Sequence, residues 1–280
     1  MYPTLIDAAT LSDQLNAPGW CIVDCRANLA DHGAGPRDYA SGHIPTAYHA
    51  HLETDLADPP IPGISGRHPL PERARLRATF ASWGIATSSQ LIVYDAERGM
   101  FAARLWWLAR WLGHSHVAVL DGGWSAWRDA GFATSTDAPP ARTLPNADLY
   151  PEQAPLTAQV EAQALMEDRV DRVLLDARTT ERFAGRNETI DPVGGHIPGA
   201  QCMPFQDNLG ADLRFLAPQH LRQRFTRAVG DATQVVCYCG SGITAAHNIL
   251  ALRIAGFDEP ALYAGSWSEW IQDPTRPRQS

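Results

Sequence analysis

The 280-residue sequence contains no long apolar run and no cluster of basic residues. No stretch of 18 apolar residues occurs, and residues 1–7 lack the positive start and apolar stretch of a signal peptide. We therefore expect a soluble, cytoplasmic protein with no membrane partner. The 23 Lys and Arg residues are scattered and are outnumbered by 31 Asp and Glu residues, which gives a formal net charge of -8. Because no basic stripe can follow a phosphate backbone, nucleic acid is not an expected partner.

Frameworks of disulfides or metal ligands are also missing. The cysteines form an odd set of five without framework spacing, namely Cys21, Cys25, Cys202, Cys237 and Cys239. This usage suits a reducing compartment better than a disulfide-bonded scaffold. Cys237 and Cys239 lie two apart, but no second cysteine pair has metal-ligand spacing, so we expect no metal site.

What the sequence does contain is an internal repeat. A chain of 280 residues has the length of about two domains, and its 45% hydrophobic residues are enough to form two cores. Four signatures occur twice in the same order: IVDCR at 22–26 and LLDAR at 174–178, GHIPTA at 42–47 and GHIPGA at 195–200, LIVYD at 91–95 and VVCYC at 235–239, GGWSAW at 122–127 and GSWSEW at 265–270. Self-similarity of this kind indicates two domains of one fold.

Buried-strand patterns alternate with helical patterns in both halves, which predicts an α/β fold. We expect two tandem domains, residues 1–135 and 156–280, each a mainly parallel sheet flanked by helices. The stretch between them, 136–155, is rich in Pro, Ala and Asp without a sustained period, so we expect a linker there. The tryptophans of the first half follow helical spacing and are expected to pack in its core.

The candidate reactive residue is Cys239, which follows an apolar strand pattern at 234–238 and precedes a helical pattern at 245–255. Two glycines, Gly240 and Gly242, allow the loop to curl so that its amide groups point inward, and the start of a helix adds its positive end. Such a loop favours an anion and stabilises a thiolate or a persulfide. The alternative is a buried structural cysteine, which is the reading we favour for Cys237.

Cysteine-dependent phosphatases use a loop of the same kind, with an arginine six positions after the cysteine. Here that position is Ala245, so the loop has no guanidinium to clamp a phosphate group. Sulfur transfer, which needs less positive charge, is therefore favoured over phosphoryl transfer.

Taken together, CGSGITA at 239–245, GHIPGA at 195–200 and GSWSEW at 265–270 resemble the tandem-domain rhodanese family over nearly the whole chain. The resemblance implies a sulfurtransferase in which Cys239 carries sulfur as a persulfide. It also implies that the first domain is catalytically silent, because Asp95 stands where the second half has Cys239. The neutral residues Gly240 and Ser241 resemble 3-mercaptopyruvate sulfurtransferases, whereas thiosulfate sulfurtransferases usually carry basic residues there.

The resemblance also assigns site residues. Arg182 matches the first of two arginines that hold the donor, and Arg186 lies in the segment of the second but out of register. His68 matches a histidine proposed to work with the loop serine, here Ser241, in protonating the leaving pyruvate. The remaining implied contacts come from the loop after the cysteine: Gly240, Gly242, Ile243 and Thr244.

This reading implies a ping-pong reaction that needs no metal or organic cofactor. The partners would be a small-molecule sulfur donor and an acceptor that is cyanide, a small thiol or a thiol protein. Two alternatives stay open. In the first, the protein has the same fold and is a thiosulfate:cyanide sulfurtransferase. In the second, it is a persulfide carrier or a regulatory binding module with little turnover.

Overall fold

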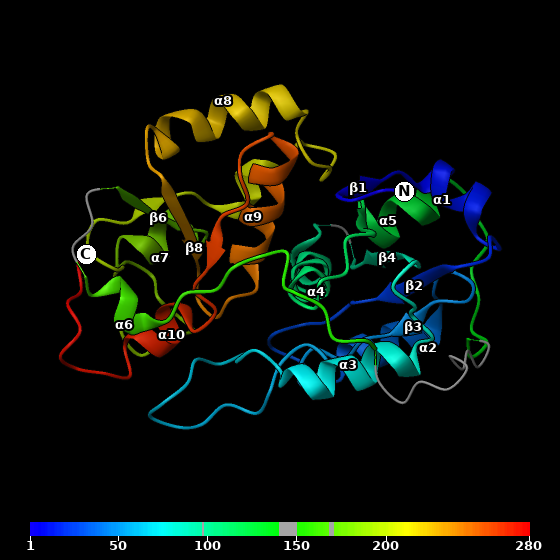
Figure 1. The fold of residues 1–280 in the computed structure, drawn as a ribbon, viewed down its shortest axis with the longest axis horizontal. Coiled ribbons are helices and arrows are strands. Elements are labelled where there is room, and N and C mark those ends of the chain that lie inside the picture. The colour runs from blue at the N-terminus through cyan, green and yellow to red at the C-terminus, as the bar shows by residue number, and fades with distance from the viewer. Residues whose placement is uncertain (97, 140–149, 168–170) are drawn as a thin grey trace. The chain divides into compact units, whose positions relative to one another are not determined.

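The computed structural model describes residues 1–96, 98–139, 150–167 and 171–280 (Figure 1). Contacts divide them into two compact units: Met1–Asp58, Pro71–Leu156 and Ala211–Arg214 form the first, and Pro59–Leu70, Thr157–Gly210 and Phe215–Ser280 form the second. Residues 140–149 of the predicted linker 136–155 lie outside the described residues, and the domain limits 1–135 and 156–280 stay a prediction. No helix in the described part of the chain is long and apolar enough to cross a membrane.

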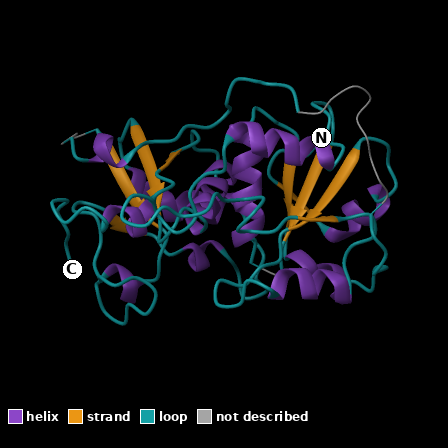
Figure 2. Ribbon diagram, turned by 90° about the horizontal axis from the view of Figure 1, so that it is seen from below, coloured by secondary structure: helices purple, strands orange, loops and turns teal. Residues whose placement is uncertain are grey.

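The first unit is built on a parallel five-stranded sheet of order β1-β5-β4-β2-β3. Its strands are β1 (Leu5–Ile6), β2 (Trp20–Asp24), β3 (Tyr48–His49), β4 (Gln90–Tyr94) and β5 (Val117–Leu120). Its helices are α1 (Ala8–Gln14), α2 (Ala34–Ser41), α3 (Arg73–Ser82), α4 (Met100–Trp111) and α5 (Gly123–Asp129). Every residue of β4 is buried, as expected for the centre of a parallel sheet with both faces covered (Figure 2).

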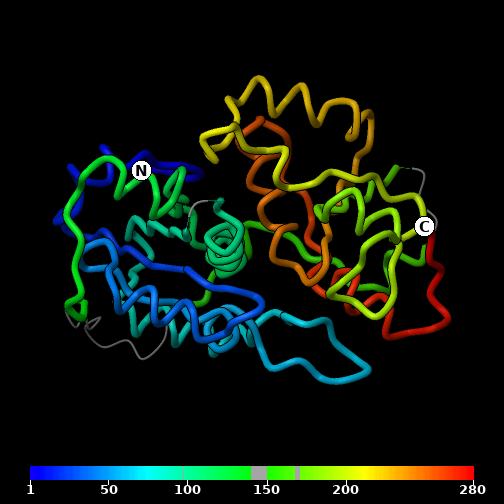
Figure 3. Tube along the Cα trace, turned by 180° about the vertical axis from the view of Figure 1, so that it is seen from behind, coloured from blue at the N-terminus to red at the C-terminus, as the bar shows by residue number. Residues whose placement is uncertain are grey.

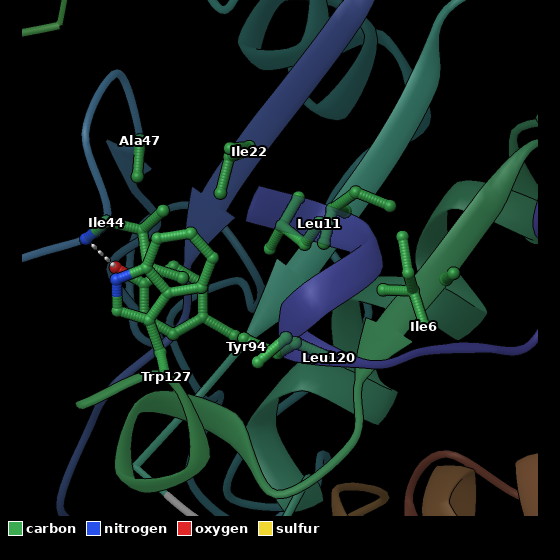
Figure 4. Packing of buried hydrophobic residues seen from close by; sticks show 11 residues of the cluster. Ile6, Leu11, Ile22, Ile44, Ala47, Tyr94, Leu120 and Trp127 are labelled. Carbon is green, nitrogen blue, oxygen red and sulfur yellow. Dashed lines mark hydrogen bonds between the residues drawn. The ribbon is translucent and has the colours of Figure 1, made fainter. Parts of the chain in front are cut away.

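Aromatic and aliphatic side chains fill the first core (Figure 4). Trp127 is fully buried there, and the hydroxyl of Tyr94 accepts a hydrogen bond from the amide of Ile44 at 3.2 Å. The predicted core role of the tryptophans is confirmed for Trp106, Trp107 and Trp127, which are 0% exposed, whereas Trp111 and Trp124 are half-buried.

The second unit repeats this plan with a parallel four-stranded sheet of order β7-β6-β8-β9. Its strands are β6 (Arg172–Asp176), β7 (Gln201–Cys202), β8 (Gln234–Tyr238) and β9 (Ala261–Leu262). Its helices are α6 (Ala162–Leu165), α7 (Thr180–Phe183), α8 (Pro218–Val229), α9 (Thr244–Ile254) and α10 (Ser266–Trp270), with a 3-10 turn at Phe205–Asn208. Gln159 forms an isolated parallel bridge with Leu262, beside β9, where the first unit has β1 beside β5. The predicted α/β class is confirmed.

The repeated sequence signatures make repeated contacts. In the first unit Arg26 donates to Asp24 at 2.6 Å and to the carbonyl of Gly42 at 2.7 Å, and its guanidinium lies 4.6 Å from the ring centre of Trp124. These residues come from three of the four signatures, so the motifs tie the end of β2 to the turn at Gly42 and to α5.

The second unit uses its own copies in the same way. Arg178 donates to Asp176 and to the carbonyl of Gly195, both at 2.7 Å, and lies 5.0 Å from the ring centre of Trp267. Asp176 and Arg178 are almost fully buried and form an ion pair, as buried charges usually do. Three of the signatures therefore hold the fold together, and the fourth, at 235–239, ends in Cys239.

Candidate active site

Cys239 lies directly after β8 and five residues before α9 begins at Thr244 (Figure 1). The loop between them turns through Gly242, whose φ of +79° is a conformation that favours glycine. A Cβ atom at this position would lie 2.5 Å from the carbonyl oxygen of Ala264, so the backbone approach also requires glycine. Cys239 itself is 2% exposed, and its Sγ accepts the N–H of Gly242 at 3.2 Å.

The start of α10 holds the loop from the other side. The amide of Cys239 donates to Ser266 Oγ at 3.1 Å, and the carbonyl of Cys239 accepts from the amide of Trp267 at 3.0 Å. The carbonyl of Gly240 accepts from the amide of Ser268 at 2.9 Å. Ser266 has a φ of 56°, which is uncommon for a residue with a side chain and costs conformational energy. The backbone around the thiol is therefore fixed before any ligand binds.

Three of the other cysteines, Cys25, Cys202 and Cys237, are in surroundings that oppose ionisation. Burial, with a smaller contribution from Cys239, raises the pKa of Cys237 far above its usual value. Burial also raises the pKa of Cys25, helped by the charges of Asp24 and Asp95, and raises that of Cys202. Since the thiolate is the nucleophile, these three cysteines are poorly placed to react.

His68 and Ser241 meet beside the thiol. His68 Nδ1 lies 2.8 Å from Ser241 Oγ, and both residues are buried, with 8% and 4% exposed. His68 comes from residues 59–70, which form an open loop without helix or strand, drawn in light blue in Figure 3. That segment packs against α10 at Gly66, where a Cβ atom would lie 2.4 Å from the carbonyl oxygen of Gly265. The structure thus brings together two residues that the sequence separates by 173 positions.

Arg182, in α7, is the predicted donor-binding arginine, and it lies beside the cysteine loop in a network of charges. Its Nε donates to both carboxylate oxygens of Glu188 at 3.0 and 2.9 Å, and its Nη2 donates to Asp191 at 2.8 Å. The other oxygen of Asp191 forms an ion pair with Arg67. A Cβ atom on Gly240 would lie 2.9 Å from Arg67 Nη2 and 3.4 and 3.5 Å from the terminal nitrogens of Arg182. Both guanidinium groups therefore reach the residue after the cysteine.

The two acids of this network respond to it differently. Burial raises the pKa of Asp191 and outweighs the lowering by Arg67 and Arg182. Burial also acts to raise the pKa of Glu188, but hydrogen bonds from Arg182 and from two backbone amides outweigh it, so the pKa falls. Their side chains are only 1% and 5% exposed, which limits screening by water.

The remaining predicted site residues lie around the same loop with one exception. Ile243 is buried and stands immediately before α9, where its apolar side chain accepts no hydrogen bond from the helix amides. Thr244 is half-buried at the start of that helix. Arg186 is exposed, and its amide donates to the carbonyl of Glu181 at 2.8 Å. The structure therefore brings Arg67, rather than Arg186, to Gly240. Among the described residues, no group of three or more His, Cys, Asp or Glu side chains is arranged to hold a metal ion.

Sequence reasoning did not find four residues of this neighbourhood. They are Arg67, Glu188, Asp191 and Ser266. One available signal was the position of Arg67 next to His68, and another was the segment 187–192, whose acids differ from the arrangement expected after Arg182.

Comparisons with known proteins identify the family of this chain. The rhodanese-like domain family matches residues 7–130 and 158–273. A protein of Pseudomonas aeruginosa named "Probable 3-mercaptopyruvate sulfurtransferase" is 47% identical over 98% of this chain and 96% of its own length. A protein of Mycobacterium tuberculosis named "Putative thiosulfate sulfurtransferase SseB" is 40% identical over 98% of this chain and 95% of its own length.

Solved structures of sulfurtransferases have a similar fold. The 3-mercaptopyruvate sulfurtransferase from Leishmania major has a TM-score of 0.81 and 29% identity, covering 98% of this chain and 75% of that one. The Escherichia coli structure SseA, described as showing the fold and mechanism of 3-mercaptopyruvate sulfotransferases, has a TM-score of 0.78 and 27% identity, covering 96% and 100%.

Proposed function

This chain belongs to the rhodanese family and is a sulfurtransferase, and we propose that it moves sulfane sulfur from 3-mercaptopyruvate to cyanide or a thiol through a persulfide on Cys239. The observation that carries the proposal is the position of Cys239. Its thiol lies between a strand and a helix start, in a loop whose backbone is fixed by Ser266 and Gly242. The N-terminus of α9, which begins at Thr244, brings the positive end of the helix dipole to the same loop.

In the first half-reaction the Cys239 thiolate attacks the sulfur of the donor. A sulfur–sulfur bond forms and the carbon–sulfur bond breaks, and its electron pair leaves with pyruvate as the enolate. Ser241 then supplies a proton to the enolate carbon and recovers one from His68, a route supported by their 2.8 Å contact. The products of this step are the persulfide and pyruvate.

Donor binding rests on the charges beside the loop. Arg182 binds the donor carboxylate, which is supported by the position of its guanidinium at Gly240. The amides of residues 240–244 hold the anionic sulfur, and Thr244 closes the loop with its hydroxyl group.

In the second half-reaction the acceptor attacks the outer sulfur and the Cys239 thiolate leaves. Cyanide gives thiocyanate in this step, whereas a small thiol or a protein thiol takes the sulfur as a new persulfide. We further propose that the first domain is catalytically silent, since Asp95 stands at the position of the cysteine. A cytoplasmic location is supported by five free cysteines.

Thiosulfate is the second candidate donor, because relatives of this chain are named thiosulfate sulfurtransferases. The test is to measure kcat/KM for both donors with cyanide as acceptor, and to follow the intact mass of the protein after donor treatment. We expect a higher value for mercaptopyruvate and a mass increase of one sulfur atom. The increase should be absent from Cys239→Ser and present in Cys202→Ser, which serves as the matched control.

A higher kcat/KM for thiosulfate would overturn the donor assignment. A sulfur adduct that forms without steady-state turnover would instead favour the persulfide carrier or binding module.

A further inference from the structure

Ser268 lies at the junction of the two segments that carry His68 and Ser241. It belongs to α10 and is 3% exposed. Its amide donates to the carbonyl of Gly240 at 2.9 Å, and its Oγ accepts the amide of Arg67 at 3.1 Å. One residue of α10 therefore binds both the loop after the reactive cysteine and the peptide directly before His68.

The hydroxyl oxygen of Ser268 is enclosed by the turn at Gly66. A Cβ atom on Gly66 would lie 2.9 Å from Ser268 Oγ and 2.4 Å from the carbonyl oxygen of Gly265. Ser268 Oγ also donates to that carbonyl group at 3.4 Å. The hydroxyl group thus directs its proton to its own helix and a lone pair to the amide of Arg67. The close approach of Gly66 keeps the two segments in contact at this point.

The segment that carries His68 has no regular secondary structure to hold it. Residues 59–70 contain neither helix nor strand, so individual contacts near the end of the segment decide where the imidazole lies. The ion pair of Arg67 with Asp191 acts on the far end of a long side chain. The hydrogen bond from the Arg67 amide to Ser268 acts on the backbone itself, one residue before His68, so it constrains the direction in which the imidazole points.

The repeat supplies a serine at the same position of the first unit. Ser125 is the counterpart of Ser268, and its amide donates to the carbonyl of Ala96 at 2.9 Å, as that of Ser268 does to Gly240. The side chain of Ser125 is half-buried and lines a cavity of the first unit. The amide contact is thus a feature of the shared fold, whereas the contact between Ser268 Oγ and Arg67 belongs to the second unit.

We propose that Ser268 is a positioning residue for the reaction, whose hydroxyl group fixes the peptide before His68 and so keeps His68 Nδ1 at 2.8 Å from Ser241 Oγ. The inference rests on the proposed function, because the proton that His68 returns to Ser241 is needed when pyruvate leaves as its enolate. Loading of sulfur onto Cys239 from mercaptopyruvate therefore depends on Ser268.

Two related reactions do not need this proton and serve as internal controls. In loading from thiosulfate, the Cys239 thiolate attacks the outer sulfur, the sulfur–sulfur bond of the donor breaks, and sulfite leaves with the electron pair. In discharge of the persulfide to cyanide, the Cys239 thiolate is the leaving group. Neither reaction protonates a carbon atom, so neither should depend on the position of His68.

The test compares Ser268→Ala with Ser125→Ala, because both changes remove one hydroxyl group at the same position of the repeat and keep the amide contact. A second variant, Gly66→Ala, disturbs the contact from the other side. Loading from mercaptopyruvate, loading from thiosulfate and discharge to cyanide are measured separately by rapid mixing. Loading is also measured in heavy water, where slow proton transfer gives a larger solvent isotope effect.

We expect Ser268→Ala to lower the maximal rate of loading from mercaptopyruvate by roughly 3- to 10-fold, the effect of one hydrogen bond, with KM nearly unchanged. The solvent isotope effect should increase. Gly66→Ala should show the same pattern with at least an equal loss. Loading from thiosulfate and discharge to cyanide should stay within twofold of wild type in both variants, and Ser125→Ala should match the wild type throughout.

A double-mutant cycle with His68→Gln separates positioning from a general structural role. If Ser268 acts through His68, Ser268→Ala should cause no further loss once His68 is replaced. Additive losses in the cycle contradict the inference, as does an equal loss of discharge and loading in Ser268→Ala. Loading from mercaptopyruvate within twofold of wild type in both Ser268→Ala and Gly66→Ala would also overturn it.

A failure of the proposed function looks different, because the wild type would then load sulfur from thiosulfate and not from mercaptopyruvate. In that case the imidazole NMR signals of His68 decide the role of Ser268. Ser268→Ala should shift them and Ser125→Ala should not, and unshifted signals in Ser268→Ala would show that Ser268 does not position His68.

Discussion

The two halves of the chain form the same strand–loop–helix but have different residues directly after the strand, Asp95 in the first half and Cys239 in the second. In the first unit Asp95 follows β4, and its carboxylate accepts the amides of Gly99 and Phe101 at 2.9 Å and that of Ala102 at 3.3 Å. In the second unit Cys239 follows β8, and its sulfur accepts the amide of Gly242 at 3.2 Å. The first loop thus binds an anion that belongs to its own chain.

The left-handed glycine lies one position later in the first loop than in the second. Each helix begins five positions after the acid or the thiol, but the left-handed glycine is Gly99 in the first loop, with φ 74°, and Gly242 in the second, with φ 79°. Gly99 is the residue immediately before its helix, whereas Gly242 is followed by Ile243 in a right-handed conformation. The comparison teaches that the first half lacks more than a thiol. Its helix amides are already bonded to a buried carboxylate.

The strongest test of this comparison is Cys239→Asp. We expect complete loss of sulfur transfer, because no nucleophilic sulfur remains, together with a higher melting temperature than Cys239→Ser. The carboxylate would accept amides at the start of α9 as Asp95 does at the start of α4, and a serine hydroxyl carries no charge to do so. Thermal denaturation of the two variants checks the order. A melting temperature of Cys239→Asp below that of Cys239→Ser would mean that the second loop cannot hold an internal anion.

The reverse change removes the anion from the first loop. Asp95 is 2% exposed, so Asp95→Ala leaves buried amides without their acceptor, and we expect a loss of about 2–3 kcal/mol in the free energy of unfolding. Urea denaturation followed by tryptophan fluorescence measures it. Asp95→Asn keeps one acceptor oxygen and should lose less. Sulfur loading on Cys239 should proceed normally in both variants, and an equal loss of loading and stability would show that the first loop is not independent of the reaction.

Much of this comparison is visible in the sequence, because strand patterns, paired signatures and the Asp95–Cys239 difference are local. These predicted the family, the α/β class and the sulfurtransferase activity, all of which the comparisons confirm. The repeat itself has a physical reason that only the structure gives, since Arg26 and Arg178 each bind an aspartate and a glycine carbonyl.

The polar network beside the thiol had no such local signal. Arg67 and Asp191 pair across 124 residues, and neither position belongs to a periodic pattern. A single arginine in a loop is equally consistent with a solvated surface charge, so chain distance and charge alone could not select Arg67 over Arg186. Ser266 was hidden for another reason. Its signature reads as a core motif, whereas its hydroxyl accepts the amide of the reactive cysteine.

Ser266 also has a counterpart that permits a finer test. Gly123 occupies the matching place in the first unit with φ 57°, close to the 56° of Ser266. Ser266→Ala keeps the strained backbone and loses the hydrogen bond to Cys239, so we expect a loss of about 1 kcal/mol in stability. Ser266→Gly loses the same hydrogen bond but relieves strain of about 1 kcal/mol, and its stability should stay near that of wild type. Both should load sulfur more slowly. Equal stabilities of the two variants would contradict strain at Ser266.

The smallest expected effect concerns stability in acid. Each unit has a buried Asp–Arg pair, and in the second unit Glu188 also lies 3.7 Å from the arginine of that pair, Arg178. Hydrogen bonds from Arg182 and two amides hold the pKa of Glu188 below its usual value despite burial. A lowered folded-state pKa means that the carboxylate stabilises the fold above its unfolded pKa of about 4.3, and that this stability is lost as the pH falls through the folded value.

Glu188→Gln should therefore reduce the melting temperature at pH 7 and reduce it less at pH 3, with a difference of a few degrees at most. Asp191 acts in the opposite direction, because burial raises its pKa, so its contribution is present at low pH and is lost as the pH rises. Melting temperatures of wild type and Glu188→Gln between pH 3 and pH 7 measure the effect. Parallel curves would mean that Glu188 does not titrate differently in the folded protein, and that the acids beside Arg182 only fix its geometry.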